Sequence, residues 1–208
     1  MSRELGHAQL MLLFAAGRVE LALGKPVWER LLPATRWCTQ FALAGDWNAA
    51  AALARETQAL RDESPSPLTW FDFTRYYETE ALLRAGDHAR AQADVRRLAE
   101  HVGTNRRYRL VYLRMRALLN RAAGDHAAAA SILSEALSLA REMNLPGEEW
   151  QIAAELSASC STLGDVQRAQ EARTESNAII DDLAARFTDL TQRDHFAQAA
   201  RSRRPALS

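Results

Sequence analysis

The chain contains few of the residues that interrupt helices, with 9 glycines and 6 prolines among 208 residues. Runs of β-branched residues are almost absent, whereas alanine, leucine, arginine and glutamate, all strong helix formers, dominate. Hydrophobic residues make up 48% and charged residues 25%, which is typical of a folded protein and not of a disordered one. The composition therefore predicts an all-α fold.

Cysteine and net charge are also scarce. The two cysteines, Cys38 and Cys160, have no CxxC neighbour, which argues against a disulfide scaffold or a zinc site and fits a reducing cytoplasm. The 26 basic and 26 acidic residues cancel, so no overall charge attracts nucleic acid or an anionic membrane. The apolar stretch Leu10–Ala16 is much shorter than the roughly 20 residues of a membrane span, and no secretory cleavage site follows Met1–Glu4. We expect a soluble cytoplasmic protein.

What the sequence does contain is a repeated Gly-Asp pair. The four glycines are separated by 41, 38 and 40 residues, and a helical pattern precedes and follows each pair. Glycine takes the left-handed conformation that ends one helix, and aspartate caps the start of the next. The four pairs are Gly45-Asp46, Gly86-Asp87, Gly124-Asp125 and Gly164-Asp165. Each pair predicts the turn of a helical hairpin.

Two columns of small residues accompany these turns. Seven residues before the glycines stand Cys38, Thr79, Ala117 and Ser157, and five residues after them stand Ala50, Ala91, Ala129 and Ala169. Small side chains at facing positions let two helices approach closely. We therefore expect the columns to meet across each hairpin.

The turns and the breakers between them divide the chain into units. Breakers are Ser64–Pro67, Gly103–Asn105 and Asn144–Gly147. The expected units are an N-terminal helix and degenerate repeat (1–33), four hairpins (34–64, 68–103, 106–145, 148–187), a capping helix (188–200) and a flexible tail (201–208). The first helices are expected over 34–44, 68–85, 106–123 and 148–163, and the second over 46–62, 87–101, 125–143 and 165–187. In the N-terminal unit we expect a long helix over 5–23 and a separate short piece over 27–32, cut by Pro26 and Pro33.

The columns at Ala117, Gly124 and Ala129 resemble the tetratricopeptide repeat. The period near 40 residues, the run Ala140–Trp150 and the ending Arg193–Phe196 look more like the repeat regions of large bacterial regulators, which follow an ATPase module and sometimes a cyclase or kinase domain. This resemblance covers roughly residues 34 to 200. It implies a right-handed solenoid of about four antiparallel hairpins with a terminal capping helix.

The sequence departs from the family in two ways. Arg173 stands where the last second helix usually has a hydrophobic residue. The family's carboxylate clamp of Lys, Asn and Arg in successive first helices is missing, so a chaperone C-terminus is a poor candidate partner.

No motif for catalysis or cofactor binding is present. The chain has no GxxxxGK[ST] loop, no HExxH and no GxSxG, and its five histidines are scattered. The segment Ser157–Ser161 lies in the middle of an expected helix, where a nucleophile has neither an exposed turn nor a partnered base. We therefore expect no catalytic, cofactor-binding or metal-binding residue.

Two features are candidate binding residues. Arg106, Arg107 and Arg109, with Arg114 and Arg116, form a basic stretch without an intervening acid. It is either a docking site for an acidic peptide or a solvated helix paired with acids such as Glu78 and Glu80. Among the aromatic residues Trp70, Phe71, Phe73, Tyr76 and Tyr77, part must be core, and Tyr76 or Tyr77 is a candidate contact on the ligand face. The predicted partner-binding residues are Tyr76, Tyr77, Arg109, Arg114 and Arg116.

The leading functional hypothesis is a non-catalytic scaffold that holds a partner peptide or helix on its concave surface. The alternative is a regulatory segment of a signal-transduction ATPase or transcriptional regulator, acting on a nucleotide-binding module outside this chain. Direct DNA binding is poorly supported because the net charge is zero and no recognition helix is evident. Membrane binding is not expected, and homo-oligomerisation stays open.

Overall fold

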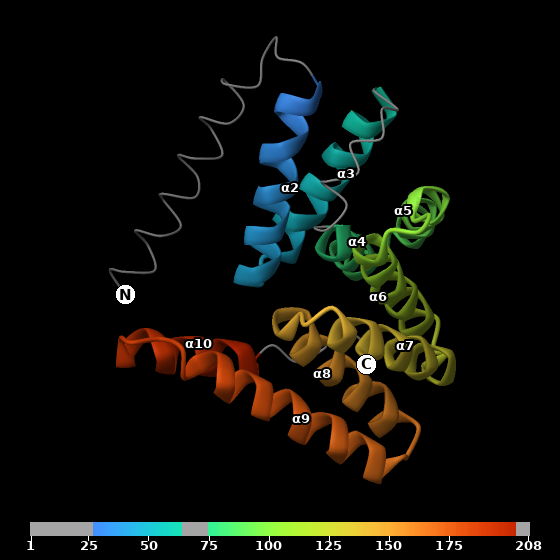
Figure 1. Ribbon diagram of the computed structural model, residues 1–208. Coiled ribbons are helices and arrows are strands. Elements are labelled where there is room, and N and C mark those ends of the chain that lie inside the picture. The colour runs from blue at the N-terminus through green and yellow to red at the C-terminus, as the bar shows by residue number, and fades with distance from the viewer. Residues whose placement is uncertain (1–26, 64–74, 203–208) are drawn as a thin grey trace. The chain divides into compact units, whose positions relative to one another are not determined.

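The computed structural model describes residues 27–63 and 75–202, and in these residues every regular element is an α-helix (Figure 1). The all-α prediction is confirmed for this part of the chain. The helices are α2 (Val27–Ala44), α3 (Trp47–Glu63), α4 (Arg75–Arg84), α5 (His88–His101), α6 (Arg106–Ala122), α7 (His126–Glu142), α8 (Pro146–Thr162), α9 (Val166–Ala184) and α10 (Leu190–Ser202). No helix among the described residues is both long enough and apolar enough to cross a lipid bilayer.

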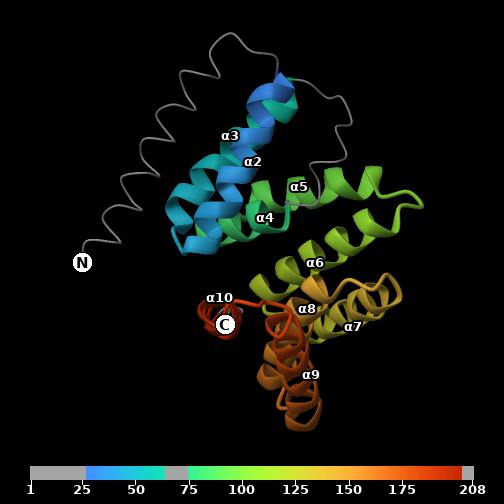
Figure 2. The same cartoon turned by 60° about the vertical axis from the view of Figure 1, so that its left-hand side comes forward.

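The chain divides into two compact units, Met1–Ala85 and Gly86–Ser208. In the first unit α3 packs against α2 and α4, and α2 also contacts α4; α2 and α3 lie side by side in both views (Figure 1 and Figure 2). In the second unit each helix from α5 to α10 packs against the next one along the chain. The boundary falls inside the predicted hairpin 68–103, so the other three predicted hairpins each lie within one unit.

The Gly-Asp turns have the predicted geometry. Gly45, Gly86, Gly124 and Gly164 have φ between +75° and +82°. At the third turn the amide of Asp125 donates to the carbonyl of Asn120 at 2.8 Å, and the amide of Gly124 donates to that of Arg121 at 3.0 Å. These two bonds form a Schellman motif, which satisfies the last free carbonyls of α6.

The aspartates cap the following helices at three of the four turns. Oδ1 of Asp46, Asp125 and Asp165 accepts from the backbone amide three residues later, at 3.0, 2.9 and 3.2 Å. Asp87 makes no such capping bond, and its carboxylate lies 3.5 Å from Nε of Arg90. The capping prediction is therefore wrong at Asp87, where the side chain turns towards a guanidinium of the first turn.

Replacing Gly124 by alanine should lower the free energy of unfolding by about 1–2 kcal/mol, because a Cβ is strained at its φ of +80°. Gly147 is the matched control, since it has no positive φ and its added Cβ would meet nothing within 4 Å. Its replacement by alanine inside α8 should be neutral or stabilising by up to about 1 kcal/mol. Urea denaturation followed by circular dichroism measures both, and equal destabilisation by the two variants would contradict the argument.

The two columns of small residues meet as predicted in two of the hairpins that lie within one unit. Cys38 and Ala50 are fully buried, and the thiol of Cys38 donates to the carbonyl of Ala50 at 3.3 Å. The hydroxyl of Ser157 donates to the carbonyl of Ala169 at 2.8 Å, at the same spacing of 12 residues. Ala117 and Ala129 are also fully buried. The residues of the first column are thus small, and in two hairpins the side chain of this residue also donates a hydrogen bond to the second helix.

The predicted break at Pro33 is wrong. Helix α2 continues through Pro33 from Val27 to Ala44. An interior proline removes one helical hydrogen bond and costs about 3 kcal/mol. A continuous stripe of buried residues on α2, however, packs against the rest of the first unit: Leu31, Ala34, Thr35, Cys38 and Ala42. Tertiary packing of this stripe outweighs the local penalty.

Other boundaries differ less. Helix α9 ends at Ala184, three residues before the predicted end at Phe187. The predicted helix over 5–23, residues 68–74 of the next first helix, with Trp70, Phe71 and Phe73, and the end of the tail lie outside the described residues. The predicted terminal helix is present as α10, where Phe196 packs on Phe187 with ring centroids 5.3 Å apart.

The core of the second unit is a continuous apolar cluster on α6, α7, α8 and α9. Leu133 of α7 belongs to this cluster and is fully buried. A second cluster joins Trp150 and Ile180 to Ala200 of α10. The last helix therefore covers apolar side chains of α8 and α9, as a capping helix is expected to do.

Candidate binding surface

Helix α6 carries six arginines and no acidic residue along its 17 residues. Because an α-helix turns 100° per residue, residues seven positions apart share a face. Arg109 and Arg116 lie on one such face, and Arg107 and Arg114 lie on another. The basic stretch is therefore distributed around the helix instead of forming one patch.

One of these faces is joined to α8 by two ion pairs. Arg114 donates to Oε1 of Glu155 at 2.8 Å and to Oε1 of Gln151 at 3.1 Å. The Arg114 and Glu155 side chains are only 8% and 7% exposed. One helical heptad earlier, Arg107 pairs with Glu148, so each arginine meets a glutamate 41 positions further along the chain. Arg114 holds two helices together here and has little surface to offer a partner.

The exposed face of α6 pairs in part with α7. Nε and Nη2 of Arg109 donate to Oε1 of Glu135 at 3.2 and 2.6 Å, and Arg106 pairs with Glu142. Arg109 is still 59% exposed. Arg116 is exposed, and its guanidinium carbon lies 5.5 Å from the centroid of the Tyr112 ring. Of the three predicted arginines, Arg109 and Arg116 are thus accessible.

The expected acidic partners Glu78 and Glu80 form ion pairs within the first unit. Glu78 accepts from both terminal nitrogens of Arg61 at 2.7 and 3.1 Å, and both side chains are buried. Glu80 accepts from Arg84 of the same helix at 2.8 Å. These carboxylates therefore stabilise α3 and α4.

The predicted tyrosines also belong to the first unit. Tyr76 is 7% exposed, whereas Tyr77 is half-buried, and their rings meet edge to face with centroids 5.4 Å apart. This is a favourable aromatic geometry within a packed helix. Tyr76 contributes mainly to the core, and Tyr77 keeps part of its surface accessible.

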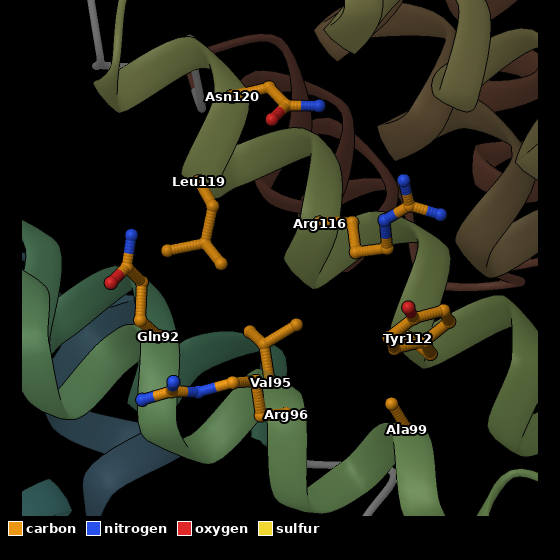
Figure 3. A pocket seen from close by; sticks show the side chains of 8 residues that line it. All are labelled: Gln92, Val95, Arg96, Ala99, Tyr112, Arg116, Leu119 and Asn120. Atoms are coloured by element: carbon orange, nitrogen blue, oxygen red, sulfur yellow. The ribbon is translucent and has the colours of Figure 1, made fainter.

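A groove lies between α5 and α6 in the second unit, and one predicted binding residue, Arg116, lines it (Figure 3). Its volume is about 370 Å³. Val95, which is buried, and the partly buried Leu119 point towards each other from the two helices, and both pack in the apolar cluster that contains Leu98 and Met115. The lining residues are Gln92, Val95, Arg96, Ala99, Tyr112, Arg116, Leu119 and Asn120. The lining contains two arginines and no carboxylate.

Of the two arginines in the groove, Arg116 was predicted from the sequence, whereas Arg96 and the contribution of α5 were not. The signal was present, because Gln92, Arg96 and Ala99 recur at the three- and four-residue spacing of one helix face. That spacing is also typical of an ordinary solvated helix. Only the packing of α5 on α6 shows that this face borders a groove.

Neither cysteine is part of this surface. Cys38 and Cys160 are buried, and removal from water raises the pKa of both thiols. The carboxylate of Glu78 raises the pKa of Cys38 further. Both thiols are therefore protonated near neutral pH and act as small packing groups. In the described ranges, no three His, Cys, Asp or Glu side chains are grouped so that they could hold a metal ion.

Comparison with protein-family models, curated proteins and solved structures gives no significant match. The geometry of the groove indicates what this surface can bind. It offers exposed guanidinium groups, an apolar strip and a half-buried aromatic ring. These groups suit recognition of another molecule by charge and shape.

Proposed function

We propose that the chain is a non-catalytic scaffold that binds a partner protein through a peptide or helix. In this proposal the hairpins form a right-handed, tetratricopeptide-like solenoid of about four repeats with α10 as its cap. Stacked hairpins present a rigid surface, and binding to it needs no chemistry. The partner's segment lies along helix faces that the stacking leaves exposed.

The observation that carries the proposal is the recurrence of one hairpin design. Turns at Gly45, Gly124 and Gly164 share the same left-handed glycine and the same aspartate cap. Two of these hairpins also share the hydrogen bond between the small-residue columns. Repetition of one supersecondary unit supports a stacked array, and such arrays commonly serve as binding surfaces.

The proposal is tested by affinity capture from host lysate with quantitative mass spectrometry, using the full chain as bait. The test variant is Arg109→Glu with Arg116→Glu, because both side chains are exposed. Arg114 is left unchanged, since its charge reversal would break a buried ion pair. The matched control is Arg173→Glu with Arg193→Glu, two exposed arginines on α9 and α10.

We expect at least one protein to be captured by the wild type and the control and reduced about tenfold or more with the test variant, as loss of charge-assisted contacts predicts. A protein captured equally by all three baits would support a scaffold that uses another face. If no protein is enriched with any bait, the scaffold proposal is wrong.

A further inference from the structure

We propose that the groove between α5 and α6 binds an acidic peptide, whose carboxylates contact Arg96 and Arg116 while an aliphatic side chain lies against Val95 and Leu119. This inference rests on the proposed scaffold function and names the chemistry of the partner. Figure 3 shows the lining side chains projecting from the two helices.

The first support is a local excess of positive charge. Helices α5 and α6 together carry nine arginines and two acidic residues, Asp94 and Glu100, although the whole chain is neutral. With histidine neutral, nine minus two gives +7 on the two helices alone. Five carboxylates of neighbouring segments pair with these arginines and reduce the local excess to +2: Asp87, Glu135, Glu142, Glu148 and Glu155. This excess attracts an acidic ligand to the two helices.

The second support is that most arginines of α5 and α6 already have interaction partners within the chain. Ion pairs with carboxylates engage Arg90, Arg106, Arg107, Arg109 and Arg114. Arg97 and Arg121 make interactions of their own. For the other two of the nine arginines, Arg96 and Arg116, no carboxylate partner is found within residues 27–63 and 75–202. Both of these arginines line the groove.

The third support is the shape and polarity between these two arginines. The buried Val95 and the partly buried Leu119 form an apolar strip along the groove, and the exposed Ala99 leaves room beside it because its side chain ends at Cβ. Gln92 and Asn120 add amide groups that can pair with a peptide backbone. The volume of about 370 Å³ is within the range of small-ligand sites, so the groove can hold a few side chains.

Tyr112 positions one of the two charges. The guanidinium of Arg116 lies over its ring at 5.5 Å, a distance at which cation and ring attract each other. This contact restricts the arginine without neutralising it. A restricted guanidinium loses less conformational entropy when a carboxylate binds.

A peptide fits these groups better than a nucleic acid does. Nucleic-acid affinity is built from many phosphate contacts, and this groove offers two uncompensated guanidinium groups in a chain of zero net charge. A phosphate backbone carries no apolar group that could cover the apolar strip between these arginines. In a peptide, an aliphatic side chain between two acidic residues would cover it.

The test is fluorescence anisotropy with the purified full chain and labelled synthetic peptides. In the probe set a leucine is flanked by two glutamates at different spacings. The control peptides replace both glutamates by glutamine or by lysine. We expect at least one glutamate peptide to bind about tenfold or more tightly than its glutamine control, and more weakly at higher salt.

The variant Arg96→Glu with Arg116→Glu should weaken this binding by about tenfold or more, since two attractive contacts become repulsive. Both side chains are exposed, so the thermal unfolding midpoint should be unchanged. Arg173→Glu with Arg193→Glu adds the same charges elsewhere and should change the affinity by about twofold or less. A milder variant, Leu119→Gln, should weaken binding through the apolar strip alone.

The groove assignment is overturned if the Arg96 and Arg116 variant binds the glutamate peptides as the wild type does, or if the control weakens binding equally. It is also overturned if single-stranded DNA binds to the groove and no acidic peptide does. If lysate capture finds a partner while no acidic peptide binds, the scaffold function stands and this inference fails. If capture finds none, the scaffold proposal itself fails.

Discussion

Replacing Arg114 by alanine should lower the free energy of unfolding by about 3–5 kcal/mol, the typical cost of removing one partner of a buried ion pair. Glu155 would keep a carboxylate that is only 7% exposed, and Gln151 would lose the donor to its side-chain oxygen. The change can be measured by urea denaturation. Native-state hydrogen exchange should show the loss in the amides of α6 and α8.

Arg109→Ala is the matched control, since it removes the same side chain from the same helix. The Arg109 ion pair with Glu135 is about half exposed on both sides, and such surface pairs contribute about 1 kcal/mol or less. A double replacement, Arg114→Met with Glu155→Leu, should recover much of the lost stability because no charge is left buried. Equal effects of Arg114→Ala and Arg109→Ala would show that burial of the Arg114 pair does not stabilise the second unit.

Leu133→Ala should also be strongly destabilising, by about 2–5 kcal/mol. Leu133 is a fully buried member of the apolar cluster formed by α6 to α9. Its truncation loses transfer free energy and leaves a cavity between helices that are held together by alanine-rich contacts. Thermal and urea unfolding both measure the change, and apolar dye binding should rise if the packing loosens.

Leu163 provides the control for this prediction. It follows α8, is 49% exposed, and loses little buried area when it is truncated. We expect Leu163→Ala to change the free energy of unfolding by about 0.5 kcal/mol or less. If Leu133→Ala were as mild as this control, the buried cluster would not be the main source of stability.

The helices and their turns were predictable from the sequence because they depend on neighbouring residues. Glycine at a left-handed position and aspartate at a helix start act within a few residues, so Gly124-Asp125 identifies a turn without knowledge of the rest of the fold. The facing of Ser157 and Ala169 followed from the same anchor, because the turn fixes which residues lie opposite each other. The regular helix periods then set most element boundaries to within a few residues.

Side-chain partners depended on tertiary structure. The sequence shows six arginines on α6, but only the packing of α8 decides that Arg114 is buried and Arg116 exposed. Pro33 is a strong local signal for a break, and the buried stripe of α2 overrides it. Similarly, Tyr76 and Tyr77 are adjacent and chemically identical. Only the packing around them makes Tyr76 a core residue and leaves Tyr77 partly exposed.

The sequence alone predicts an all-α fold with hairpin turns at defined places, because capping, glycine geometry and helix period are local properties. Which charges are paired inside the fold and which stay exposed depends on the tertiary structure. The pairing involves contacts between residues that are distant in sequence, such as Arg114 and Glu155, which are 41 positions apart along the chain. Because such contacts depend on the packing of whole helices, no short stretch of sequence could specify the groove between α5 and α6.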